Sequence, residues 1–174
     1  MKKYIGFVML GLLLFAGCAR KHQPLKQTQN NYSLLFSQAK SKAKPLAKKV
    51  LQKAYELSFV KKVIVRGSCW DYINTIYHQA GFPAKKRKVI FKGEKRGSFA
   101  NLDLVQPGDW LYFVNYSYHK VGHSGLFINW IDRKKRLALI LSYAGENRKV
   151  PARYKVYDIS SVYYIVRAYE GDKL

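Results

Sequence analysis

One cysteine in the middle of the chain stands where a nucleophile is expected. Cys69 follows Gly67-Ser68 and opens a stretch of helical character that ends near Ala80. At the first turn of a helix, unpaired backbone N–H groups and the positive end of the helix dipole favour a thiolate over a thiol. This placement indicates a nucleophilic cysteine, and a buried, inert cysteine is the alternative.

A cysteine nucleophile needs a histidine to take or share its proton. Four histidines are present. His22 lies in a polar stretch, His78 follows Cys69 on the same helix about 13 Å further along its axis, and His119 lies in a polar loop. His123 is the best candidate, because it opens an apolar strand that would fix it opposite a helix start. A structural histidine is the alternative for His123.

The same residues do not form a metal site. His119 and His123 would share a metal at this spacing only on a helix, and Gly122 together with the β-rich surroundings disfavours one. The sequence contains neither an HExxH nor a CxxC motif. We therefore predict no metal and no other cofactor.

The elements that must position Cys69 and His123 are helices followed by strands. A helical segment over 34–62, interrupted at Pro45, precedes the helix that starts at Cys69. Residues 84–101 are rich in lysine and arginine and predict a basic loop or irregular hairpin. Strands are predicted over 110–116, 123–131, 137–143, 155–159 and 162–169. This order favours an α+β domain with an antiparallel sheet.

The N-terminus has the pattern of an export signal. Two lysines and an apolar run over 4–16 precede Cys18, and the run is shorter than the 20 or so residues that cross a bilayer as a helix. Leu14-Phe15-Ala16-Gly17-Cys18 resembles the bacterial lipobox, in which the cysteine is lipidated. We expect a signal peptide over 1–17, a lipid anchor at Cys18, a flexible tether over 18–33 and one domain over 34–174. An ordinary secretory signal is the alternative.

The charge of the chain is strongly one-sided. There are 32 Lys and Arg against 10 Asp and Glu, a formal net charge of +22. Such a chain is attracted to polyanions. For an exported lipoprotein, the partners are then membrane headgroups, reached through the anchor at Cys18, and peptidoglycan or another anionic envelope polymer, not nucleic acid. By resemblance to sorting in enteric bacteria, Ala19 favours the outer membrane, facing the periplasm.

The order of these motifs resembles the NlpC/P60 family of bacterial cell-wall cysteine peptidases. The family pattern is a cysteine at a helix start, a helix ending in Ala-Gly, a Pro-Gly-Asp turn into a strand, and a histidine opening the next strand. Here it appears as Cys69, Ala80-Gly81, Pro107-Gly108-Asp109 and His123, within about residues 60–169. The resemblance implies a papain-like α+β fold in which N-terminal helices pack on an antiparallel sheet or partial barrel.

The third catalytic position follows from the same resemblance. In the family a polar residue on the next strand orients the histidine, and its place falls at Ser142, with Glu146 and Asn147 as alternatives. The family's Asp-Cys-Ser-Gly is replaced here by Ser68-Cys69-Trp70-Asp71, so the chain is a divergent member.

The function implied is a lipid-anchored cysteine peptidase or amidase that hydrolyses peptidoglycan stem peptides through a Cys-His acyl-enzyme mechanism. Two alternatives stay open. One is a related hydrolase or acyltransferase that acts on lipid or another amide. The other is a non-enzymatic envelope lipoprotein that binds the wall through its basic surface.

Overall fold

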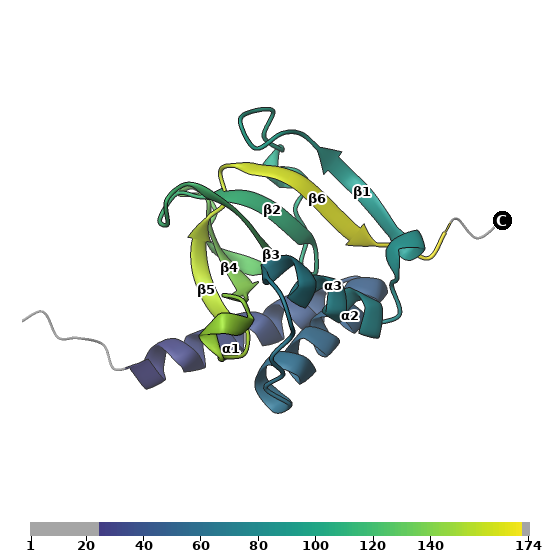
Figure 1. Cartoon of the computed structure of the whole chain (residues 1–174), viewed down its shortest axis with the longest axis vertical. Coiled ribbons are helices and arrows are strands. Elements are labelled where there is room, and N and C mark those ends of the chain that lie inside the picture. Colours follow the sequence, from purple (N-terminus) through teal and green to yellow (C-terminus); the bar gives the residue numbers. More distant parts are fainter. Residues whose placement is uncertain (1–24, 172–174) are drawn as a thin grey trace, which may run out of the picture.

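A computed structural model describes residues 25–171, with side chains from Asn31 onward (Figure 1). The helices are α1 Leu25–Lys42, α2 Pro45–Tyr55 and α3 Cys69–Gln79, and a π-helical turn, Glu56–Val60, continues α2. The strands are β1 Arg87–Lys92, β2 Trp110–Asn115, β3 Val121–Asp132, β4 Leu137–Ser142, β5 Arg153–Asp158 and β6 Val162–Ala168. Short 3₁₀ helices span Ala84–Lys86, Leu102–Leu104 and Glu146–Arg148.

The six strands form one antiparallel sheet in the order β1-β6-β2-β3-β4-β5. The sheet is curled, and the three helices gather beside it (Figure 1). The predicted α+β class with an antiparallel sheet is therefore confirmed. The strands expected from alternating apolar residues all form, with bounds that differ by a residue or two.

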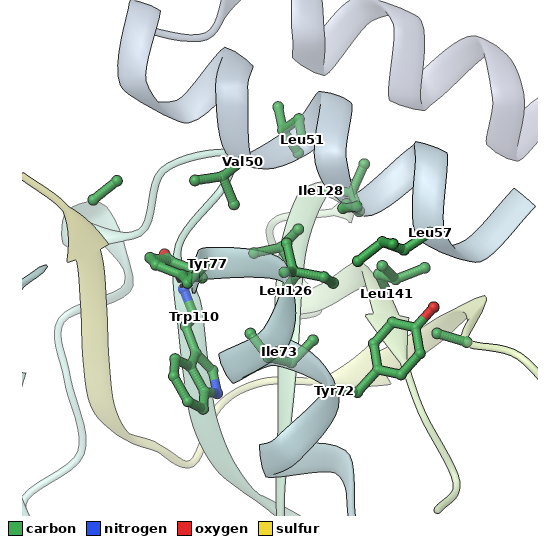
Figure 2. Close-up of a cluster of buried hydrophobic side chains, with 14 of the residues drawn as sticks. Val50, Leu51, Leu57, Tyr72, Ile73, Tyr77, Trp110, Leu126, Ile128 and Leu141 are labelled. Carbon is green, nitrogen blue, oxygen red and sulfur yellow. Dashed lines mark hydrogen bonds between the residues drawn. The ribbon is translucent and has the colours of Figure 1, made fainter. Parts of the chain in front are cut away.

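Side chains alternate between two hydrophobic clusters on the two faces of the sheet. Leu126 and Ile128 of β3 join the cluster that contains residues of all three helices, whereas Phe127 between them joins the other cluster. We call these the helix face and the opposite face. Figure 2 shows the helix face, where Ile73 and Tyr77 of α3 pack over β2 and β3.

The helical region begins earlier than expected. Residues 25–33, predicted as part of the tether, belong to α1. The reason is visible in Tyr32 and Phe36, which recur at helical spacing and pack into the cluster on the helix face. The signal peptide over 1–17 and the lipidation at Cys18 lie outside the described residues and stay predictions. No helix between Leu25 and Gly171 is long and apolar enough to cross a bilayer.

The basic segment 84–101 contributes a strand that its sequence did not predict. Residues Arg87–Lys92 form β1, which pairs with β6 at the edge of the sheet. The guanidinium of Arg87 fixes the start of β1, because it donates to the side chain of Asn74 on α3 and to the carbonyl oxygen of Phe82. The remaining lysines and arginines suit an edge strand, where charge discourages pairing with other chains.

The Pro-Gly-Asp turn has a structural role. Asp109 is 1% exposed and accepts two 2.7 Å hydrogen bonds from the guanidinium of Arg167 on β6. Gly108 adopts a φ of 88°, and a Cβ there would come within 3.1 Å of Ala47 on α2. The turn therefore ties the start of β2 to β6 and lets α2 approach closely.

Candidate active site

Cys69 is the first residue of α3, and its neighbours hold that helix start in place. Ser68 is the N-cap: its Oγ accepts a 3.2 Å hydrogen bond from the backbone N–H of Trp70, and the carboxylate of Asp71 accepts one of 2.7 Å from the backbone N–H of Ser68. This reciprocal pair is a capping box. As the first helical residue, Cys69 has no acceptor within the helix for its own N–H.

The carboxylate of Asp71 is bound to Ser68 as part of the helix cap. Hydrogen bonds from the backbone and side chain of Ser68 lower the pKa of Asp71. Gly67 must be glycine here, because its φ is 105° and a Cβ would lie 2.3 Å from a carboxylate oxygen of Asp71. The Gly67-Ser68-Cys69-Trp70-Asp71 sequence thus encodes the helix start, with Cys69 half-buried at its tip.

The structure brings His123 and Ser142, the pair that the family resemblance implies, within contact of each other. The Nε2 atom of His123 lies 2.9 Å from Oγ of Ser142, within hydrogen-bond distance. Ser142 Oγ also lies 2.9 Å from the hydroxyl of Tyr157 on β5, which is 3.4 Å from the same imidazole nitrogen. The ring of His123 also meets Phe113 edge-on. Two strands therefore hold Nε2, a third contacts the ring, and no residue described in the structure hydrogen-bonds the Nδ1 atom.

The imidazole is held neutral. Burial, with a smaller contribution from the positive charge of Lys155, lowers the pKa of His123 to about 4. The neutral ring keeps a lone pair that can accept a proton, as a general base must, but a pKa of about 4 makes it a weaker base than an ordinary histidine. If Nε2 carries the hydrogen and donates it to Ser142, the lone pair of Nδ1 remains open to a thiol.

Cys69 lies at the same end of the sheet as His123 and Ser142. The carbonyl oxygen of Gly67 accepts a 3.0 Å hydrogen bond from the backbone N–H of Glu146, four residues beyond Ser142. Burial, with a smaller electrostatic contribution from nearby Cys69, raises the pKa of Tyr163 on β6. The Tyr163 hydroxyl in turn lies 3.4 Å from where a Cβ of Gly122 would stand.

The faces of the sheet separate the two groups. α3 packs on the helix face through Tyr72 and Ile73, whereas the ring contacts of His123 are with Phe113 and Tyr157 of the opposite face. Among the described residues, no hydrogen bond joins Cys69 to His123 or Ser142. A reacting pair would have to meet around the end of the sheet.

The other sequence candidates lie outside this hydrogen-bonded group. Glu146 and Asn147 are in a 3₁₀ helix, and in the described structure neither side chain bonds to His123. His119 lies in the β2–β3 turn with its ring against Tyr118. Nowhere between residues 31 and 171 do three His, Cys, Asp or Glu side chains come together as ligands for a metal ion.

Sequence reasoning missed two groups of aromatic residues. Tyr157 was predicted only as part of a strand, because its contact with Ser142 depends on how β4 and β5 pair. Trp70 donates its indole N–H to the hydroxyl of Tyr112 at 2.8 Å, and Tyr163 lies close to the ring of Tyr112. In the sequence, only the position of Trp70 directly after Cys69 indicated that an aromatic residue lies beside the candidate nucleophile.

A cavity of about 280 Å³ lies elsewhere, between the turn joining α1 to α2 and the start of β2. It is lined by Ala43, Leu46, Ala47, Pro107, Gly108 and Arg167 among others, and neither Cys69 nor His123 contributes to it. The end of the sheet where Cys69 lies is therefore separate from this cavity. Comparison of the chain with known protein families, curated proteins and solved structures finds no match.

Proposed function

We propose that this protein is a cysteine peptidase or amidase that hydrolyses peptidoglycan stem peptides, with Cys69 as nucleophile and His123 as base. One observation carries the proposal. The imidazole of His123 is oriented through Nε2 by Ser142, and no side chain between residues 31 and 171 hydrogen-bonds Nδ1, at the end of the sheet where α3 presents Cys69. A base oriented by a third polar group is what this class of catalysis requires.

The chemistry follows from those two groups. Nδ1 of neutral His123 takes the proton of the Cys69 thiol, and the thiolate attacks the carbonyl carbon of an amide bond. The resulting oxyanion accepts a hydrogen bond from the backbone N–H of Cys69 at the helix start. The imidazolium then protonates the leaving amine, and water releases the acyl group with His123 again acting as base.

For this reaction, the side chains of Cys69 and His123 have to approach each other around the end of the sheet. Catalytic hydrogen bonds in enzymes without substrate are often long and shorten when substrate binds. The loop after β4 is the element that would adjust, because it contacts the segment before Cys69 through Gly67 and directly follows Ser142.

The envelope setting rests on the sequence. The lipobox-like segment at Cys18 and the net charge of +22 support a lipid-anchored protein that acts on an anionic wall. The papain-like NlpC/P60 architecture is the finer form of this proposal, supported by the order of the motifs and by an α+β fold with an antiparallel sheet.

The test uses the full chain, purified in detergent and incubated with peptidoglycan, with released fragments read by mass spectrometry. We expect fragments cut within the stem peptide that disappear in Cys69→Ala. His78→Ala is the matched control, because His78 is an exposed residue of the same helix. Fragments that persist in Cys69→Ala would reject the mechanism.

A second function is favoured by the missing hydrogen bond between Cys69 and His123. A non-enzymatic lipoprotein would bind the wall through its lysines and arginines alone. It predicts no fragments, and wall binding that is equal in the wild-type chain and in Cys69→Ala and that weakens as salt rises.

A further inference from the structure

Trp70 is a large apolar ring that the fold holds in one orientation and leaves open to solvent. It is 44% exposed, although its indole N–H is fixed on the hydroxyl of Tyr112 at 2.8 Å and its ring packs 5.5 Å from that of buried Trp110. A ring that is fixed in one orientation and left partly exposed offers a ligand a preorganised face, because little side-chain freedom is lost on binding.

The rim of this ring carries unused hydrogen-bonding groups. The hydroxyl of Tyr112 accepts from Trp70 and keeps its own hydrogen to donate. The hydroxyl of Tyr163 has no hydrogen-bond partner among the described residues. Burial raises the pKa of Tyr112 to about 12 and also raises that of Tyr163, so both stay protonated donors at neutral pH.

This group adjoins the candidate nucleophile. Trp70 directly follows Cys69 in the chain, and Cys69 is close enough to Tyr163 to contribute to its raised pKa. Gly122 keeps the space beside the Tyr163 hydroxyl free of a side chain, and the aliphatic part of Lys95 passes over the same place. The side chain of Lys95 therefore passes near the hydroxyl of Tyr163.

We propose that Trp70, Tyr112 and Tyr163 form a subsite for a sugar ring, so that the substrate is a stem peptide still attached to its amino sugar. The inference rests on the proposed function and names its substrate more closely. The apolar C–H face of a pyranose packs on the face of an aromatic ring, and its hydroxyl groups pair with the phenols. Lys95 suits a carboxylate on the attached peptide.

A purely apolar ligand fits this group less well. An aliphatic side chain or an acyl chain seated on Trp70 would cover the hydroxyls of Tyr112 and Tyr163 without pairing them, and unpaired buried hydroxyls are costly. A nucleic-acid base would also stack on Trp70 beside a cation, as in single-strand binding proteins. The test separates it from a sugar.

The experiment measures binding to the full chain carrying Cys69→Ala, in a detergent without a sugar headgroup, by titration calorimetry. The probes are an N-acetylmuramyl dipeptide, the same dipeptide without sugar, an N-acetylglucosamine oligomer and a short oligothymidylate. We expect the sugar-bearing dipeptide to bind about tenfold more tightly than the free dipeptide, the magnitude of one aromatic contact.

The added affinity should depend on the proposed subsite. Trp70→Ala in the same background should remove the tenfold preference, and Tyr163→Phe, which deletes one hydroxyl, should weaken sugar binding about fivefold. Tyr118→Ala is the matched control, because Tyr118 is 54% exposed on the β2–β3 turn. If Trp70→Ala does not fold, the sugar affinity of Tyr163→Phe tests the subsite by itself.

Equal affinity for the dipeptide with and without sugar would overturn the inference. So would unchanged sugar binding in both variants, or binding of oligothymidylate alone that Trp70→Ala abolishes. Because the nucleophile is absent throughout, failure of hydrolysis by the wild-type chain is a separate result: sugar binding without hydrolysis would keep the subsite and reject the peptidase.

Discussion

The two halves of the candidate site are held in opposite ways. Cys69 stands half-buried at an exposed helix start that residues 67–71 cap among themselves. His123 is enclosed by side chains from neighbouring strands, with Ser142 and Tyr157 on its Nε2 atom. The first arrangement is local and open to substrate, and the second is long-range and shielded from water. A nucleophile needs access, whereas a base that must stay neutral needs burial and a fixed orientation.

The largest effect should come from removing the shielded half. His123→Ala should lower kcat for stem-peptide hydrolysis by about 10²- to 10⁴-fold, the usual value of a general base. His119→Ala, four residues away on the exposed β2–β3 turn, should leave kcat unchanged. Fragment release followed over time measures both. Equal losses of kcat in the two variants would mean that His123 is not the general base.

The shielding itself predicts a pH dependence of stability. Because the folded-state pKa of His123 is about 4 and that of the unfolded chain is near 6.5, the unfolded state binds more protons between these values. The free energy of unfolding should therefore fall as the pH drops from 6.5 to 4, by roughly 3 kcal/mol from this group. Denaturant unfolding at several pH values measures the change.

The control for that pH dependence is His123→Gln, which lacks a titrating ring at the same place. Its stability should lose this part of the decline while keeping the part due to other groups. If the two pH profiles run parallel, His123 is not shielded in the folded protein and the contrast between the two halves fails.

A smaller effect is expected at the open half. Ser68→Ala removes the N-cap of α3 and should lower the free energy of unfolding by about 1 kcal/mol. It should also slow alkylation of Cys69 by iodoacetamide at neutral pH, because a frayed helix start stabilises the thiolate less. Ser41→Ala, an exposed serine whose Oγ bonds only within its own turn, is the control. Unchanged alkylation would show that the cap does not tune the thiol.

The smallest effect tests the second cause of the lowered histidine pKa. Lys155→Met keeps the length of the side chain and removes its charge, so the pKa of His123 should rise by less than burial lowers it. The acid decline in stability should accordingly level off at a slightly higher pH and be slightly smaller. NMR titration of the His123 ring protons gives the value. A fall in the pKa would contradict the electrostatic explanation.

Part of the fold could be predicted because its signals are local. The start of α3 at Cys69, its end before Gly81 and the strands from 110 onward follow from capping residues, glycine and alternating apolar residues. β1 could not, because a short apolar run flanked by basic residues, within a segment rich in lysine and arginine, has the composition of a solvated loop until β6 pairs with it. The start of α1 was hidden for a similar reason: only packing against the core selects a helix for a mostly polar segment.

The sequence alone determined the identity of the candidate nucleophile and base, the order of the elements that carry them, and the strongly positive net charge. Only the tertiary structure decided which residues surround His123, on which face of the sheet its ring lies, and that Trp70, Tyr112 and Tyr163 gather beside Cys69. The physical reason is range. Helix caps and strand alternation act over a few residues, whereas the meeting of side chains depends on strand register between segments tens of residues apart.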